Sequence, residues 1–175
     1  MKHSSQPASI AAKHVPLMLV LGLTGFAVTP AWADGLREVD QSIFGMDCAP
    51  CAAGVEKGLS KLPGVTSVRV SLNEGKAVAL LAPDSATTLA QIREVIRHNG
   101  FTPKDASVTV VGRLVRDGKR WWIDAGLAGR WLLEAPDLAL LDVQTPASAN
   151  SVTLRVVVPG TPSTPPTVRV VKREG

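Results

Sequence analysis

The only two cysteines of this 175-residue chain, Cys48 and Cys51, lie two residues apart in the stretch GMDCAPC. A Cys-x-x-Cys pair can bind a metal ion, exchange electrons as a disulfide, or pin a loop. A disulfide across so short a gap restricts little of the unfolded chain, and it therefore adds little stability. The spacing indicates chemistry at the sulfur atoms and not a structural staple.

The residues around the cysteines predict a loop that leads into a helix. We expect Cys48 on the loop and Cys51 in the first turn, since Pro50 suits the start of a helix. Backbone donors and the dipole at a helix N-terminus lower the pKa of a thiol, and thiolates select Cu(I), Zn(II) and heavier soft ions. Gly45 permits a bend after the preceding strand. Met46 is expected to pack inward, with a thioether ligand as the alternative.

The apolar pattern from Leu36 to Val111 predicts the elements that hold this loop. One helix is expected over 50–61, and a second helix carries Leu89, Ile92 and Ile96 on one face. Strands are expected over 37–44, 65–72, 76–82 and 101–111. The order βαββαβ predicts the α+β class and a ferredoxin-like sandwich.

The pattern changes after Gly112, where short apolar runs alternate with Gly, Pro and Ser. These runs predict successive strands over 112–118, 119–126, 129–135, 138–143, 151–158 and 167–174. We therefore predict two domains after residue 33: one over 34–111, and a small all-β domain over 112–175, with an OB-like barrel as its suggested form. Whether the strand from Val108 belongs to the first fold, the second, or both stays open.

The run Gly45-Met46-Asp47-Cys48-x-x-Cys51 resembles the GMTCxxC motif of heavy-metal-associated domains, a family of copper chaperones, N-terminal domains of metal-exporting P-type ATPases and the periplasmic mercury-binding protein. The resemblance covers about residues 36–111. It implies that Cys48 and Cys51 bind one metal ion, with Met46 and Phe101 packed near the loop. It also implies transfer of that ion to a membrane metal transporter or another metal-binding domain, in metal homeostasis, transport or detoxification.

Asp47 departs from the family motif, because copper-type members have threonine there. A carboxylate beside two thiolates adds a hard oxygen donor, which suits a divalent ion such as Zn(II) better than two-coordinate Cu(I). GMDCxxC is similar to the motif of zinc, cadmium and lead exporters. Alternatively, Asp47 caps the following helix. Both readings stay open, so Cu(I), Zn(II), Cd(II) and Hg(II) are all candidate ions.

The first 33 residues predict a secretory signal peptide. Lys2 and Lys13 precede an apolar run over 15–28, and a small-x-small ending predicts cleavage after Ala33. The run is shorter than the roughly 20 residues of a membrane span, although an uncleaved anchor is the alternative. We expect a periplasmic or secreted protein without stable membrane insertion. Cleavage lowers the formal net charge from +4 to +2, which gives no strong argument for nucleic acid as partner.

Two other functions fit parts of the sequence. A thiol–disulfide oxidoreductase would use the same cysteine pair, but the charge of Asp47 would raise the pKa of Cys48 instead of activating it. OB-like barrels bind single strands through aromatics in a basic groove. Trp121 and Trp122 must point to opposite faces of a strand, so we expect one in the core and the other half-exposed. We therefore expect a metal-binding protein that is not an enzyme and has no nucleic acid partner.

Overall fold

The computed structural model describes residues 34–83, 85–134 and 151–174, which fall within one compact unit, Ala31–Gly175. The predicted signal peptide, 1–33, and the strand predicted over 138–143 lie outside the described residues. Among the described residues, no helix has both the length and the apolar character needed to cross a membrane.

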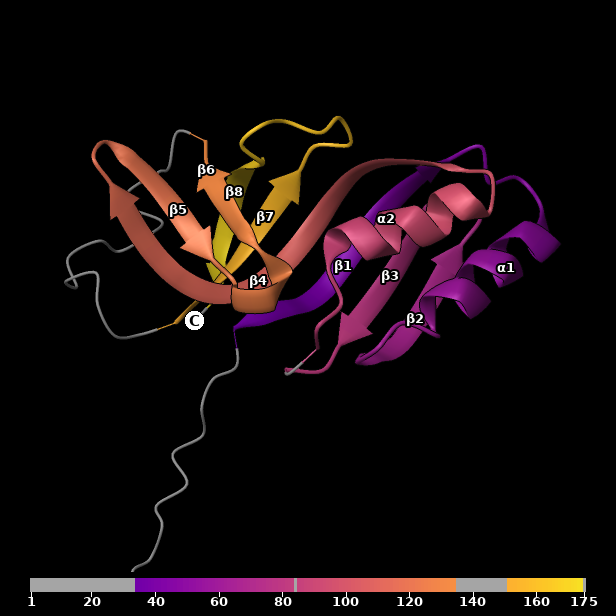
Figure 1. Cartoon of the computed structure of the whole chain (residues 1–175). Helices are drawn as coiled ribbons and strands as arrows, with labels where there is room; N and C mark the ends of the chain where they lie inside the picture. The colour runs from indigo at the N-terminus through magenta and orange to yellow at the C-terminus, as the bar shows by residue number, and fades with distance from the viewer. Residues whose placement is uncertain (1–33, 84, 135–150, 175) are drawn as a thin grey trace, which may run out of the picture. The chain divides into compact units, whose positions relative to one another are not determined.

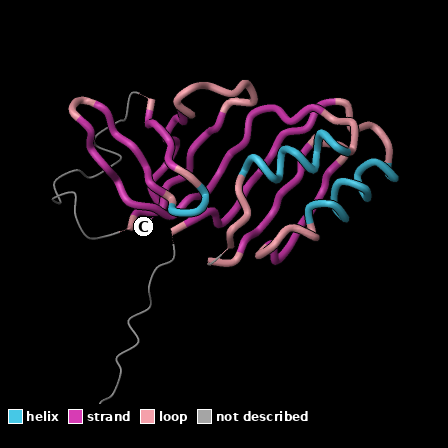
Figure 2. The backbone as a smooth tube through the Cα atoms, in the orientation of Figure 1, coloured by secondary structure: helices cyan, strands magenta, loops and turns pink. Residues whose placement is uncertain are grey.

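The first half of the fold contains the predicted strands and helices in the predicted order. They are β1 (Gly35–Phe44), α1 (Ala49–Leu59), β2 (Val65–Ser71), β3 (Lys76–Leu81), α2 (Leu89–His98) and β4 (Thr102–Asp117). The four strands pair antiparallel in the order β2-β3-β1-β4. Both helices cover the same face of this sheet (Figures 1 and 2). This arrangement is the ferredoxin-like α+β fold predicted from the sequence.

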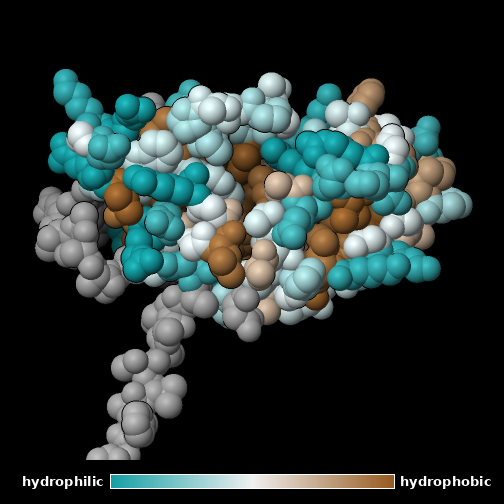
Figure 3. Space-filling view, in the orientation of Figure 1, coloured by the Kyte–Doolittle hydropathy of each residue, from teal (hydrophilic) through white to brown (hydrophobic). Residues whose placement is uncertain are grey.

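Helix α2 begins at a capping box and buries one apolar face. Thr88 caps α2, because its hydroxyl accepts from Gln91 N at 3.3 Å while the Gln91 side chain accepts from Thr88 N at 2.8 Å. Leu89, Ile92 and Ile96 then form the buried face of α2, as the spacing predicts. Hydrophobic residues gather between α2 and α1 in the space-filling view, whereas the outward side of α2 is hydrophilic (Figure 3).

Strand β4 is the element that joins the two halves of the chain. It runs for 16 residues, pairs with β1 and β7, and then pairs with β5 (Arg120–Asp124) (Figure 1). The strand predicted from Val108 therefore runs through both halves, and the predicted boundary after residue 111 falls inside it. Gly112 permits the change of partner. A Cβ atom there would lie 2.5 Å from the Asp124 carbonyl oxygen, so only glycine lets β4 approach β5 this closely.

The strands of the second half pair in a closed cycle. β5 pairs with β6 (Arg130–Leu133), β6 runs parallel to β8 (Thr167–Glu174), β8 pairs with β7 (Val152–Val158), and β7 returns to β4. Alternate residues of these strands point into a common core; among them are Trp121, Ile123, Trp131, Leu133, Leu154, Val156 and Val168. The second half is therefore all-β, as the strand-like runs predict.

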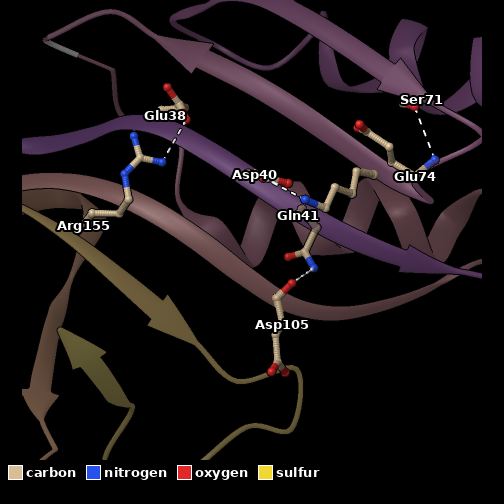
Figure 4. A network of polar contacts seen from close by, with 8 residues as sticks. Glu38, Asp40, Gln41, Ser71, Glu74, Asp105 and Arg155 are labelled. Carbon is tan, nitrogen blue, oxygen red and sulfur yellow. Dashed lines mark hydrogen bonds and ion pairs between the residues drawn. The ribbon is translucent and has the colours of Figure 1, made fainter. Parts of the chain in front are cut away.

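Two arginines hold the halves together, one buried and one half-exposed. Arg93 of α2 is 8% exposed, and it donates to Gln41 Oε1 at 3.0 Å and to the Val158 carbonyl of β7 at 3.1 Å. Burial lowers the pKa of Arg93, and the nearby charge of Arg97 lowers it further. Gln41, which is fully buried, donates in turn to the Asp105 carbonyl at 3.3 Å (Figure 4).

The half-exposed arginine, Arg155 of β7, lies on the sheet face opposite the helices. Its guanidinium contacts Glu38 of β1 at 3.3 Å (Figure 4). It also contacts Glu174 of β8 at 3.1 Å. The hydrogen bond with Glu174 raises the pKa of Arg155, although partial burial opposes the rise. These contacts tie β1, β7 and β8 together on that face.

Candidate metal centre

The cysteine pair lies at the junction of a loop and helix α1. Cys48 is the N-cap residue with extended backbone angles, φ −131° and ψ 145°, and α1 begins at Ala49. The backbone N–H of Cys51 donates to Cys48 Sγ at 3.2 Å. The sulfur of Cys48 thus takes the place that a capping oxygen usually has at the start of a helix. No acidic residue occupies the first turn of α1. The positive end of the helix dipole therefore acts on the sulfur atoms, and no carboxylate of that turn offsets it.

The two sulfur atoms are joined to each other as a disulfide, and their Cα atoms lie 5.1 Å apart. The structure therefore represents the oxidised form of the pair. A disulfide sulfur offers no thiolate to a metal ion. Reduction by two electrons and two protons would give two thiols, each of which becomes a metal ligand when it loses its proton.

Asp47 lies beside the cysteines, as the motif requires, but it does not cap the helix. One ligand atom each from Asp47, Cys48 and Cys51 lie within 4.8 Å of one another. The Asp47 side chain is exposed, whereas both cysteines are partly buried. The reading of Asp47 as the helix cap is wrong, because the N-cap residue is Cys48 and its sulfur accepts the first-turn N–H. The carboxylate is thus free of any capping bond and stands at the outer side of the sulfur pair.

Three residues support the cysteine loop on the side that faces the hydrophobic core. Gly45 has φ +89°, a left-handed conformation that glycine adopts without strain, and this bend turns the chain out of β1. Met46 is 6% exposed and belongs to the hydrophobic core, so its thioether points inward, away from the exposed side of the loop. Phe101 packs against the same core, and a Cβ atom on Gly45 would lie 4.0 Å from its ring.

Sequence reasoning missed one residue beside the loop. Phe44, the last residue of β1, is 66% exposed, and Lys104 Nζ lies 5.2 Å above the centre of its ring. The alternation along β1 carried the signal, because Ile43 is buried on the helix side and Phe44 must then face the other way. The metal loop is therefore bordered by an exposed aromatic ring and a cation.

Comparisons with known proteins agree with the residue pattern of this site. The sequence model of the heavy-metal-associated domain matches residues 42–102. The copper chaperone CopZ of Staphylococcus aureus (strain bovine RF122 / ET3-1) is 33% identical over 60 residues, which make up 34% of this chain and 87% of CopZ. The copper-exporting P-type ATPase of Bacillus subtilis (strain 168) is 38% identical over 65 residues, 37% of this chain and 8% of the ATPase.

Similarity to the larger relatives is confined to one domain, since the chain spans a tenth or less of the length of the copper-exporting ATPases that it matches. A solved structure of a CopZ metallochaperone aligns with 37% of this chain and 94% of its own length, at 26% identity and a TM-score of 0.35. The match to CopZ covers 87% of that small protein, and the residues matched by the domain model, 42–102, include both cysteines. The chain therefore belongs to the heavy-metal-associated domain family, through residues 42–102.

Proposed function

We propose that the reduced chain captures one soft metal ion between the thiolates of Cys48 and Cys51 and passes it to another protein. The observation that carries this proposal is the meeting of ligand atoms from Asp47, Cys48 and Cys51 within 4.8 Å on a partly exposed loop. In this reading the metal ion is cargo, and the protein is a carrier and not an enzyme.

The position of the site suits transfer of the ion as well as capture. The thiolates are held at a helix N-terminus, where the backbone N–H groups and the dipole stabilise their negative charge. Both cysteines remain partly exposed, so a thiolate of a partner can approach the bound ion from the solvent side. Ligands can then exchange one at a time, and the ion never has to leave as a free cation.

The relatives and Asp47 favour different metal ions. Copper appears in the names of the chaperone and ATPase relatives, which supports Cu(I), an ion that two thiolates alone can bind. The carboxylate of Asp47 adds an oxygen ligand, which favours Zn(II) or Cd(II). We propose Cu(I) as the first candidate, with Zn(II), Cd(II) and Hg(II) as competitors that the experiment below compares.

The setting of this activity is a further part of the proposal. We propose that the protein acts in the periplasm after export, with a membrane metal transporter or another metal-binding domain as the recipient. We also propose that the second half is an OB-like barrel. The support is its strand cycle β4-β5-β6-β8-β7 with one parallel pair, β6 with β8, which is the pairing of a five-stranded Greek-key barrel.

The test is metal binding by the reduced protein, with and without the two thiols. The purified chain is reduced, and bound metal is measured by elemental analysis, followed by competition among Cu(I), Zn(II), Cd(II) and Hg(II). We expect one equivalent of metal, and none for Cys48→Ser/Cys51→Ser with an unchanged circular dichroism spectrum. Met46→Leu is the matched control: it removes a buried sulfur at nearly constant volume and should leave binding intact. Tight binding of one equivalent by the double serine variant would refute the proposal.

The disulfide favours a second candidate, thiol–disulfide exchange with other proteins. Cys48 and Cys51 are oxidised in the structure, and Pro50 stands between them. Such an enzyme would accept two electrons from a substrate dithiol and become a dithiol itself. Insulin reduction separates the two functions. We expect no turnover above that of dithiothreitol alone, and rapid turnover would favour the oxidoreductase.

A further inference from the structure

A hollow of about 410 Å³ lies on the sheet face opposite the helices, and strands of both halves line it. This volume is in the range of small-molecule sites, about 300–1,000 Å³. Leu80, which is 42% exposed, and Val111 contribute apolar surface to it. We call this space the sheet hollow; the residues on which its chemistry depends are Arg37, Glu38, Leu80, Thr109, Arg155 and Glu174.

A β-bulge in β1 puts two charged residues into the sheet hollow from consecutive positions. Leu36 pairs with Val110 of β4 and Glu38 with its neighbour Thr109, so Arg37 is the extra residue. The bulge interrupts the alternation of the strand, and both Arg37 and Glu38 line the hollow. A guanidinium and a carboxylate thus stand side by side on one strand.

Arg155 of β7 stands across the hollow from them, between two carboxylates. Its Nε contacts Glu174 at 3.1 Å and its Nη1 contacts Glu38 at 3.3 Å. The Nη2 group of Arg155 has no partner among the described residues, although each of its N–H bonds can donate. Each glutamate contacts Arg155 through Oε1, which leaves Oε2 able to accept from a ligand.

The hydroxyl of Thr109 is a second unused polar group at the sheet hollow. Thr109 is 6% exposed, and its Oγ1 is shielded from solvent without a partner among the described residues. It lies on β4, in register with Glu38 on one side and Arg155 on the other. Buried hydroxyl groups normally have a hydrogen-bond partner, so this one points to a group that completes the site.

The charges of the lining select the class of ligand. Two guanidinium groups, Arg37 and Arg155, balance two carboxylates, Glu38 and Glu174, whereas the exposed Lys172, in register with Arg155, does not line the hollow. A ligand with a single charge would meet a like charge beside each opposite one. A zwitterion can pair with both kinds of group. The described lining has no aromatic ring to stack on a base or a sugar.

We propose that the sheet hollow binds a zwitterionic aliphatic α-amino acid such as leucine. The ligand carboxylate accepts from Arg155 Nη2, and its ammonium donates to Glu38 or Glu174. Its aliphatic side chain covers Leu80 and Val111. A shift of the half-exposed Arg155 side chain uncovers the Thr109 hydroxyl, which then donates to the ligand carboxylate. The proposal does not depend on metal binding.

A nuclear magnetic resonance titration of the isotope-labelled full chain, free of metal, tests this site. Leucine is compared with isoamylamine, which lacks the carboxylate, and with isocaproate, which lacks the ammonium. We expect leucine to cause saturable shifts of amide signals on β1, β4 and β7. Each analogue should bind about tenfold more weakly or worse, a difference of about 1.4 kcal/mol. No saturable shift with leucine, or equal binding of either analogue, would overturn the proposal.

Thr109→Val and Arg155→Leu connect the binding to the hollow. Thr109→Val keeps a branched side chain and should weaken leucine about fivefold without lowering the urea midpoint, because the lost hydroxyl has no partner in the free chain. Arg155→Leu should abolish binding with an unchanged circular dichroism spectrum. Thr102→Val, the same change at an exposed position of β4, is the matched control and should leave the affinity within about twofold. Equal affinities of the Thr109 and Thr102 variants would place leucine elsewhere and refute the proposed site.

Discussion

Replacement of Arg93 by leucine tests whether the two halves of the chain fold as one unit. Arg93 lies on α2 in the first half, yet it donates to the Val158 carbonyl at the end of β7 in the second half. It also donates to Gln41 Oε1 of β1 and to the Lys104 carbonyl of β4. Arg93→Leu removes all three bonds and leaves a shorter, apolar side chain.

The expected loss follows from the acceptors that remain. Gln41 is 0% exposed and its Oε1 loses the donor Arg93 Nε, and the Val158 carbonyl loses a donor at 3.1 Å. An unpaired buried acceptor costs about 1–3 kcal/mol, so two of them cost about 2–6 kcal/mol. Relief from the burial of a charge offsets part of this cost. We therefore expect a net loss of about 3 kcal/mol, a large fraction of the roughly 5–15 kcal/mol of a typical domain.

Urea unfolding measures this loss with two probes. Tryptophan fluorescence reports on Trp121 and Trp131 in the second half, and circular dichroism at 222 nm reports on α1 and α2 in the first half. We expect the two probes to give the same midpoint, which shifts to lower urea in Arg93→Leu. In Gln41→Leu/Arg93→Leu the loss should be smaller than the sum of the single losses, because the orphaned Oε1 is removed with its donor.

Arg155→Leu is the control for this experiment, because Arg155 also joins the halves but does so through partly exposed ion pairs at 3.1 and 3.3 Å. Exposed pairs contribute about 0–1 kcal/mol, so its loss should stay below about 1 kcal/mol. An Arg93→Leu loss no greater than that of Arg155→Leu would refute the reasoning that the buried network couples the halves.

The helix interface, Asp47 and the disulfide each give a further expectation. Gly58→Ala should destabilise the chain by about 1–2 kcal/mol in thermal unfolding, because its Cβ would lie 2.6 Å from Val95 Cγ1 and the overpacking outweighs the gain in helix propensity. Gly54→Ala is the matched control and should be nearly neutral, because its Cβ meets only the movable end of the Asn99 side chain at 2.9 Å. Asp47→Thr should weaken Zn(II) and Cd(II) far more than Cu(I) in competition titrations; equal losses for all three ions would show that the carboxylate is not a ligand. Metal uptake should require prior treatment with a thiol reductant, and one equivalent bound by the oxidised chain would place the site elsewhere.

Local pattern was sufficient to predict the first half of the fold. The period of Leu89, Ile92 and Ile96, the capping residues before α2, and the alternation along β1 and β3 are all properties of neighbouring residues. For the same reason the sequence placed Cys48 on a loop and Cys51 in the first turn of α1. Helix starts, turns and amphipathic faces depend on residues within a few positions of one another.

The cap of α1 was not predictable in the same way. Asp47 and Cys48 stand next to each other, and aspartate has the stronger capping preference. The backbone path out of Gly45, with φ +89°, places Cys48 at the N-cap position and leaves Asp47 one residue outside the helix. The backbone conformation of Gly45 thus determines that Cys48, and not Asp47, caps the helix. The Asp47 carboxylate is therefore available beside the sulfur atoms.

Residue types and their spacing alone determined the family, the order of elements and the pair of sulfur atoms on which the proposed chemistry depends. Only the tertiary structure decided that β4 pairs with strands of both halves, because strand pairing joins residues far apart in the chain, such as Val110 with Leu154. The buried contact of Arg93 with the Val158 carbonyl follows from that same pairing. A sequence carries the preferences of each segment, whereas the partner across a strand edge depends on where the whole chain has folded.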